Sequence, residues 1–138
     1  MKELIIYYSF GGKCRAVAEA MAKEQDCDLL ELAEPKKRGM VSALLIGCPK
    51  AMKMSPVPLK PVECDMTRYE SFILIFPIWA NFPAPPFNNA VAMLPKGARA
   101  ELVMVSGSGD SSKSRPAVEK RLAEFGVTVT GYRDIKSE

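Results

Sequence analysis

The sequence of 138 residues contains no histidine, no closely spaced pair of cysteines and no long apolar run. Without histidine the chain has no Ser-His-Asp or Cys-His nucleophile, no histidine-ligated zinc or haem, and no histidine acid–base chemistry. Any chemistry must therefore use backbone groups, hydroxyls, carboxylates, thiols or a bound cofactor. An apolar content of 48% and a charged content of 25% are ordinary for a globular chain, and the length predicts a single domain over residues 1–138.

The four cysteines, Cys14, Cys27, Cys48 and Cys64, form no CxxC pair, which excludes a thioredoxin-like motif and a zinc knuckle. A core of this size needs no disulfides, so reduced thiols are expected. No stretch approaches the ~18 apolar residues of a membrane span, and the apolar run after Glu3 is too short for a signal peptide. The sequence predicts a cytoplasmic protein that binds no membrane.

The charge balance is mild, since 19 Lys and Arg against 16 Asp and Glu give a formal charge of +3. That charge is too small to demand a nucleic acid or a membrane as partner, so neither is expected. The densest basic run is Lys36-Lys37-Arg38. Such a run is typical of a solvated loop, and a phosphorylated or acidic partner is the alternative interpretation.

Three continuous apolar runs predict strands that are buried on both faces of a parallel sheet. They cover residues 4–8, 72–76 and 102–105, and each is followed closely by Gly or Pro. Residues 27–32 and 127–130 carry polar side chains within the run, which is typical of strands at the edges of a sheet.

Helices are predicted between these strands. Apolar side chains repeat at helical spacing over residues 13–24 and 115–125, a shorter helix is expected over 86–94, and one helix is expected near 40–53. This alternation predicts an α/β fold, a doubly wound five-stranded parallel sheet with helices on both faces. Because the three fully apolar strands belong in the middle, the expected strand order is 2-1-3-4-5.

In that order a ligand binds at the carboxyl ends of the first and third strands. The first loop at this edge holds Gly11 and Gly12 between a buried strand and a helix. Its amide hydrogens can converge on an anion, helped by the helix N-terminus, the charge of Lys13 and the hydroxyl of Ser9. A plain strand-to-helix turn is the other interpretation, and the glycines alone do not decide between the two.

The second loop, residues 77–86, contains the single tryptophan, Trp79, together with Phe82 and four prolines. A stiff aromatic loop at this edge is suited to hold a flat ring, although a core position for Trp79 is the simpler interpretation. Asn81 tolerates left-handed backbone angles. The third loop, residues 106–114, is small and polar, so it either wraps a ligand with backbone amides or simply connects a strand to a helix.

Together these segments resemble the flavodoxin family over nearly the whole chain. Residues 9–14, Ser-Phe-Gly-Gly-Lys-Cys, stand where the family has a phosphate loop of the pattern S/T-x-T-G-x-T. Residues 69–79 are similar to its segment of Tyr-Asp, an apolar strand and Pro-Ile/Val-Trp, and the prolines at 83–86 match many members. The Gly- and Ser-rich loop from Ser106 falls where the family has its third cofactor loop.

The resemblance implies one non-covalent FMN and a role in electron transfer, with binding residues rather than catalytic side chains. The redox partner would be a protein or a small-molecule electron donor or acceptor. The phosphate is expected on Ser9, Phe10, Gly11, Gly12, Lys13 and Cys14. The flavin ring is expected against Pro77, Ile78, Trp79, Ala80, Asn81 and Phe82, and against Ser106, Gly107, Ser108, Gly109 and Asp110.

Three departures from the family leave alternatives open. Gly11 and Cys14 replace two threonines that usually bond the phosphate, which suits a flavin-free interaction module. The positive charge contrasts with the acidic electron carriers of the family and suits an NAD(P)H-dependent flavin or quinone reductase. Residues for the usual closing helix do not follow the last strand, so an apolar sheet face is expected to be uncovered. A homodimer or the segment 38–54 is expected to cover it.

Overall fold

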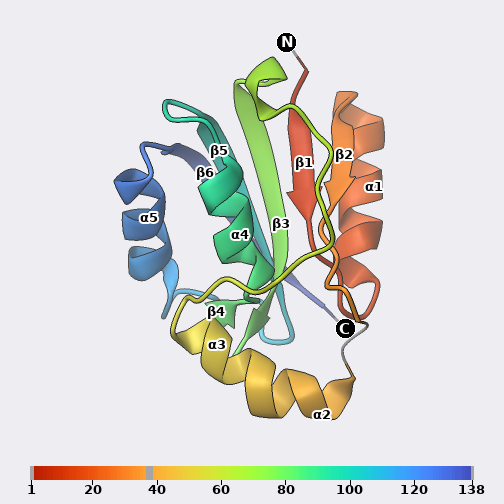
Figure 1. The fold of residues 1–138 in the computed structure, drawn as a ribbon, viewed down its shortest axis with the longest axis vertical. Coiled ribbons are helices and arrows are strands. Elements are labelled where there is room, and N and C mark those ends of the chain that lie inside the picture. The colour runs from red at the N-terminus through yellow and green to blue at the C-terminus, as the bar shows by residue number, and fades with distance from the viewer. Residues whose placement is uncertain (1, 37–38, 138) are drawn as a thin grey trace.

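The computed structural model describes residues 2–36 and 39–137. Five parallel strands form the sheet in the order β2-β1-β3-β5-β6 (Figure 1). They are β1 (Leu4–Tyr7), β2 (Asp28–Glu31), β3 (Ser71–Trp79), β5 (Arg99–Ser106) and β6 (Thr128–Lys136). A two-residue strand, β4 (Phe82–Pro83), pairs antiparallel with the end of β3. Apart from that short addition, the predicted strand order is confirmed.

The helices between the strands follow the apolar spacing of the sequence. The main ones are α1 (Lys13–Gln25), α4 (Pro86–Met93) and α5 (Arg115–Glu124). A short 3-10 turn, η2 (Met66–Arg68), precedes β3. Helix α1 buries Cys14, Ala18 and Met21, one residue per turn. Helix α5 has a proline in its first turn, which needs no N–H there, and ends before Gly126 with a φ of 75°.

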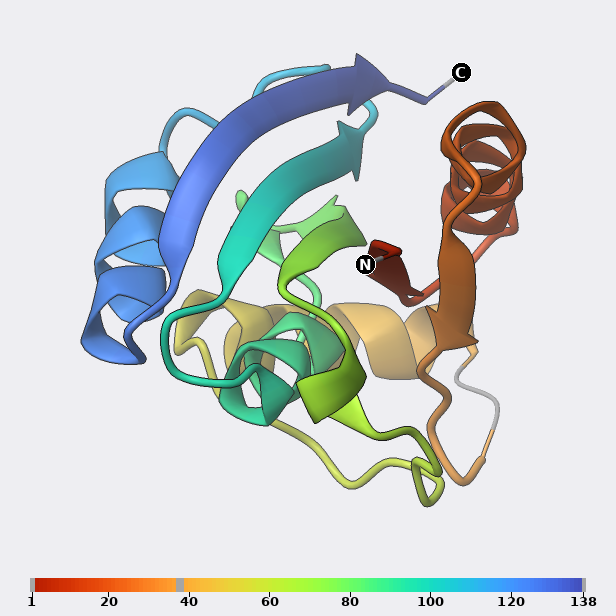
Figure 2. The same cartoon turned by 90° about the horizontal axis from the view of Figure 1, so that it is seen from above.

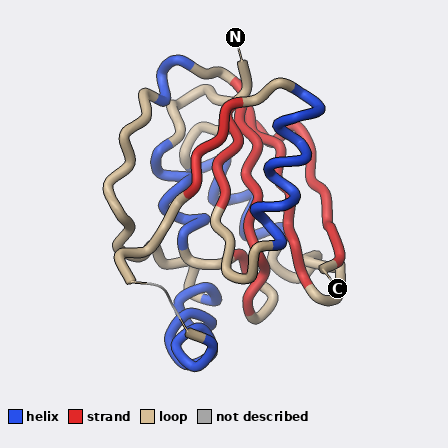
Figure 3. The backbone as a smooth tube through the Cα atoms, turned by 90° about the vertical axis from the view of Figure 1, so that its right-hand side faces the viewer, coloured by secondary structure: helices blue, strands red, loops and turns tan. Residues whose placement is uncertain are grey.

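The single helix predicted near residues 40–53 is a composite of three pieces. It consists of α2 (Met40–Ser42), a π-helical turn η1 (Ala43–Gly47) and α3 (Cys48–Met52). Figure 3 shows this segment below the carboxyl ends of the strands. Residues 40–52 are called the composite helix below.

Two apolar layers hold the helices to the sheet. On one face α4 and α5 pack over β3 and β5, and the rings of Phe76 and Phe87 meet edge to face at 5.5 Å. On the other face α1 packs over β1 and β3. Figure 2 shows α1 on one side of the sheet, with α4 and α5 on the other. The prediction of helices on both faces is therefore confirmed.

The prediction of an uncovered apolar face is wrong. On the α1 side, Ile73, Ile75 and Val103 are each 0% exposed, and Ile135 of β6 packs against the same cluster. Farther from α1 the face is polar, because Glu101 forms an ion pair with Arg133 across β5 and β6 at 3.0 Å. Among the described residues, this face therefore carries no large apolar patch, and a homodimer at this face stays an untested prediction that has lost its original reason.

The composite helix does not cover that face either. Its last piece, α3, contacts β3 and β4, and the segment lies on the side of the sheet that carries α4 (Figure 2). Of the segment predicted to cover the face, Arg38 lies outside the described residues.

Strand β6 is longer than the run predicted over residues 127–130. It continues to Lys136 in pairing with β5, past a bulge at which Val129 pairs with Ala100 and Gly131 pairs with Glu101. Both β2 and β6 lie at the ends of the strand order, as predicted from their polar residues. Among the described residues, no helix has the length and apolar character needed to cross a membrane.

Candidate functional site

The loops after β1 and β3 meet at the carboxyl edge of the sheet, because the two strands are parallel neighbours. The Trp79 ring touches two aromatic rings of the first loop, both edge to face. Its centroid lies 5.5 Å from that of Phe10 and 6.0 Å from that of Tyr8. Two of the three predicted loops are thus joined by an aromatic cluster of Tyr8, Phe10 and Trp79.

The first loop directs backbone amides at one point. The Ser9 Oγ accepts hydrogen bonds from the N–H of Gly12 at 3.0 Å and from that of Arg15 at 3.3 Å. Gly12 takes a left-handed φ of 92° as the N-cap of α1, which only glycine adopts readily. Amides that converge on one oxygen at a helix N-terminus form an arrangement suited to an anion.

Space around this loop is open. A Cβ added to Gly11 or Gly12 would meet no heavy atom within 4 Å. Lys13 is exposed at the first position of α1, so its ammonium can approach an anion on the loop. Cys14 differs from the rest of the loop, because its side chain is 3% exposed and lies in the core under α1. Burial raises the pKa of this thiol to about 12, so it stays protonated and offers little to a ligand.

The second predicted loop is a β-hairpin rather than an irregular loop. Trp79 pairs with Phe82, and the two residues between them, Ala80 and Asn81, have φ values of 51° and 73°. Two left-handed residues make a type I′ turn. The tolerance of Asn81 for such angles was predicted, whereas Ala80 adopts them at a cost of about 1–2 kcal/mol.

The hairpin places the remaining predicted residues of this loop on a stiff frame. Ile78 pairs with Pro83 in the ladder, and the carbonyl of Pro77 accepts the N–H of Ala84 at 2.8 Å. Ile78 and Trp79 are half-buried against the core that α4 and α5 cover. The backbone of Trp79 is therefore fixed by pairing with the second strand of the hairpin, which limits the positions that its ring can take.

The third loop is closed by hydrogen bonds among its own residues. The Ser106 Oγ accepts the N–H of Gly109 at 3.0 Å, and the Ser108 Oγ accepts that of Asp110 at 3.2 Å. Gly107 and Ser108 are exposed. The backbone N–H of Ser112 donates to Asp110 at 2.9 Å and lowers the pKa of that carboxyl.

Sequence reasoning missed the side chain that anchors this loop. Ser111 is 1% exposed and donates to Asp134 Oδ1 at 2.6 Å, and it also bonds to the hydroxyl of Tyr132. The guanidinium of Arg115 lies 4.3 Å above the Tyr132 ring. The signal available in the sequence was weak, since serines are common in this loop and only the pairing of β5 with β6 brings the partners together.

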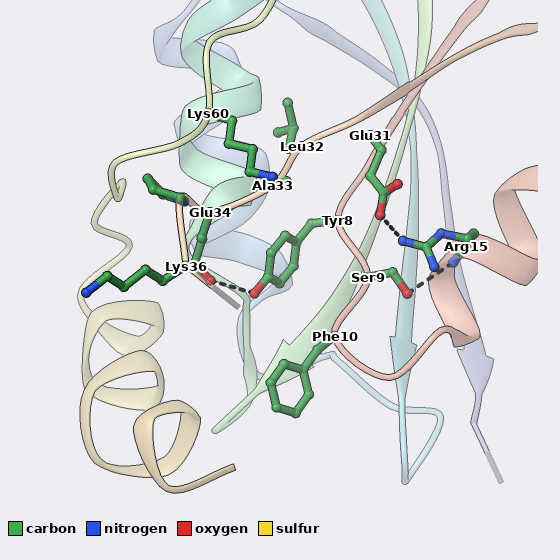
Figure 4. Close-up of a pocket in the computed structure, with 11 residues that line it drawn as sticks. Tyr8, Ser9, Phe10, Arg15, Glu31, Leu32, Ala33, Glu34, Lys36 and Lys60 are labelled. Atoms are coloured by element: carbon green, nitrogen blue, oxygen red, sulfur yellow. Dashed lines mark hydrogen bonds and ion pairs between the residues drawn. The ribbon is translucent and has the colours of Figure 1, made fainter. Parts of the chain in front are cut away.

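A hollow of about 330 Å³ lies beside the first loop, between the carboxyl ends of β1 and β2 (Figure 4). Its volume is at the lower end of the range for ligand cavities. The residues that line it are Tyr8, Ser9, Phe10, Arg15, Glu31, Leu32, Ala33, Glu34, Pro35, Lys36 and Lys60. Of these, only Ser9 and Phe10 were predicted to bind a ligand; the predicted position of β2 beside β1 points to the residues after β2, but not to Arg15 or Lys60.

The charged side chains of this hollow are largely paired. Arg15 forms an ion pair with Glu31, and the Tyr8 hydroxyl donates to Glu34 Oε1 at 2.6 Å (Figure 4). Lys36 and Lys60 are exposed at its border. The other two members of the predicted basic run, Lys37 and Arg38, lie outside the described residues.

No protein-family model and no curated protein matches this chain. Solved structures do match it. A flavoprotein from Lactobacillus acidophilus, crystallised in complex with FMN, is 21% identical with a TM-score of 0.77 over 95% of this chain and 91% of its own. The apo-form of a flavoprotein from the same organism is 19% identical, with a TM-score of 0.69 over 97% of this chain and 92% of its own. Oxidised flavodoxin 1 from Bacillus cereus is 16% identical, with a TM-score of 0.56 over 100% of this chain and 87% of its own.

The fold is flavodoxin-like. In this flavodoxin-like sheet the strand order reverses at β1 and β3, and the converging amides of the first loop and the Trp79 ring both stand at that reversal. The resemblance drawn from the phosphate loop and the Trp79 segment therefore agrees with the tertiary structure.

Proposed function

We propose that this protein binds one FMN and acts in electron transfer. One observation carries the proposal: amides that converge at the N-terminus of α1 lie beside the Tyr8, Phe10 and Trp79 cluster, at the ligand-binding edge of a doubly wound sheet. The similar flavoprotein from Lactobacillus acidophilus, crystallised with FMN, supports the same assignment.

The first loop fits a phosphate. Gly11 and Gly12 leave the approach open, and the N–H groups that now donate to the Ser9 hydroxyl point toward a common acceptor. A phosphate placed there would accept from these amides and from the Ser9 hydroxyl, with Lys13 supplying a full positive charge. Each charge-assisted hydrogen bond contributes about 1.5–3 kcal/mol.

The aromatic hairpin fits a flat ring. Trp79 is half-buried, packs edge to face with Phe10, and pairs with Phe82 across a two-residue turn. The third loop would add backbone groups of Gly107 and Ser108 at the other border of the ring. FMN supplies the redox chemistry when it is bound, and these residues orient the ring and limit the access of water to it.

The test is a titration of the protein with FMN, followed by the fluorescence of Trp79. Because Trp79 is the single tryptophan, quenching reports directly on this site. We expect saturable quenching with one FMN per chain. Riboflavin, which has the same ring and no phosphate, is expected to bind more weakly. A protein that purifies colourless and shows no quenching with FMN is the flavin-free module that Gly11 and Cys14 suggest, and the proposal then fails.

A second candidate on the same site is an NAD(P)H-dependent flavin or quinone reductase. The formal charge of +3 favours it, because the acidic electron carriers that the chain resembles dock on basic partners. Steady oxidation of NAD(P)H by the purified, FMN-loaded protein in the presence of a quinone supports the reductase. Absence of turnover, with FMN bound, supports the carrier.

A further inference from the structure

The composite helix turns large apolar side chains toward the solvent. The exposed fractions are 68% for Val41, 61% for Leu44, 71% for Leu45, 50% for Ile46 and 56% for Met52. These five residues are called the apolar helix face. Elsewhere in the described chain, Leu29 and Phe125 are the other large apolar residues of this kind, and each is 43% exposed. Exposed apolar side chains are therefore concentrated on one short segment, which marks an interaction surface.

The inward side of the composite helix is made of small residues. Ala43, Gly47 and Ala51, spaced four apart, are buried toward the body of the protein. The π-helical turn over Ala43–Gly47 keeps them on one line, and such turns occur frequently at functional sites. Small residues allow close packing but leave no room for the large side chains, which consequently face outward.

Side chains of α4 and α5 anchor the chain that follows the composite helix. Asn89 brackets Val57: its Oδ1 accepts the N–H at 3.0 Å and its Nδ2 donates to the carbonyl at 2.7 Å. Arg121 donates to the carbonyl of Met54 at 3.1 Å. These bonds hold residues 54–57 and, with them, the end of α3.

The charge of this region has one sign. Residues 39–62 contain Lys50, Lys53 and Lys60 and no Asp or Glu, in a chain that holds 16 acidic residues. Lys50 is half-buried and Lys53 is exposed, both on the last turn of the composite helix or just after it. An apolar surface on a segment whose own charged residues are all cations complements a negatively charged partner.

The shape of the segment favours a lipid surface over a protein. The composite helix projects beyond the carboxyl ends of the strands (Figure 3), and a projecting helix needs a matching groove on a protein partner but none on a bilayer. Amphipathic helices with exposed Leu and Met and bordering lysines lie in the boundary between lipid headgroups and acyl chains.

We propose that the apolar helix face attaches this protein to the surface of an anionic bilayer, in contrast to the expectation from composition and charge that it binds no membrane. The side chains of the face enter the headgroup boundary, and Lys50 and Lys53 lie against lipid phosphates. The carboxyl edge of the sheet, with the Trp79 hairpin, then lies next to the membrane, because α3 contacts β3 and β4. The attachment does not depend on FMN, so a failure of this proposal and a failure of the proposed function can be told apart.

The test is sedimentation of the full-length protein with phospholipid vesicles. Vesicles of phosphatidylcholine alone are compared with an equimolar mixture of phosphatidylcholine and phosphatidylglycerol, at low and high salt. We expect binding to the anionic vesicles that weakens as salt rises. The double substitution Leu44→Asp with Leu45→Asp should weaken binding by more than about tenfold. Lys50→Ala and Lys53→Ala should each weaken it by about fivefold.

Phe125→Asp is the control for an added carboxylate: it places one such charge, where the double variant places two, at an exposed apolar residue away from the apolar helix face. It should leave vesicle binding unchanged, and thermal melts should show that all variants fold. A wild-type protein that does not sediment with anionic vesicles overturns the proposal. A protein dimer that Leu44→Asp with Leu45→Asp dissociates, without vesicle binding by the wild type, also overturns it and assigns the face to a second copy.

Discussion

Replacing Gly11 by threonine tests whether the first loop holds a phosphate. No heavy atom lies within 4 Å of a Cβ added at Gly11, and its φ is outside the left-handed region, so a side chain fits without strain. The threonine hydroxyl adds one donor to the loop, and a charge-assisted hydrogen bond contributes about 1.5–3 kcal/mol. We therefore expect FMN to bind about ten- to a hundredfold more tightly to Gly11→Thr than to the wild type.

The assay is the quenching of Trp79 fluorescence by FMN, measured for Gly11→Thr and Gly11→Val alongside the wild type. Valine has the shape of threonine without the hydroxyl, so the difference between the two variants isolates the hydrogen bond. Gly12→Thr is a contrasting variant, because at a φ of 92° a side chain costs about 1–2 kcal/mol and the fold should lose stability. If Gly11→Thr and Gly11→Val bind FMN equally tightly, the hydroxyl meets no phosphate and the assignment of this loop is refuted.

Three further predictions concern stability. Burial raises the pKa of Cys14 from 9.0 to about 12, so the free energy of unfolding should be intact below pH 9. The contribution of Cys14 should then fall by about 1.4 kcal/mol per pH unit toward pH 12, in addition to those of Tyr7 and Tyr132, whose pKa values burial also raises, and Cys14→Ala should remove this share of the slope in urea titrations. Ala80→Gly should raise the free energy of unfolding by about 1 kcal/mol by relieving the left-handed turn, and a lower melting temperature would argue against that strain. Ser111→Ala should cost about 1–3 kcal/mol in thermal melts, since it leaves the Tyr132 hydroxyl without this partner, whereas the exposed Ser112→Ala should be neutral.

The arrangement of the strands followed from the chain because buried parallel strands are apolar on both faces. The runs at 72–76 and 102–105 lie in β3 and β5, and the run at 4–8 lies in β1 except for Tyr8; these are the central strands of the sheet. Their order then placed the first loop and the Trp79 segment at one edge, where Phe10 and Trp79 do meet. Hydrophobic periodicity is visible in each short segment, and the strand order follows from general rules of parallel sheets. Together they were enough to place the first loop beside the Trp79 segment.

Side-chain partners far apart in the sequence escaped prediction. The hollow beside the first loop depends on residues after β2 and on Lys60, which come together only through the packing of the segment before β3. The sequence also wrongly predicted an uncovered apolar surface on the α1 face. That face is instead occupied by Ile135 and by the ion pair of Glu101 with Arg133, which join two strands. Such contacts have no local signature.

By itself the sequence determined the α/β alternation, the strand order and the identity of the loops at the ligand-binding edge, because each follows from hydrophobic periodicity and from Gly and Pro at turns. Only the tertiary structure decided that Cys14 belongs to the core, that Trp79 stands on a type I′ hairpin, and that the composite helix turns its large side chains outward. Those outcomes depend on which face of an element meets its neighbours, and packing between distant segments sets that choice.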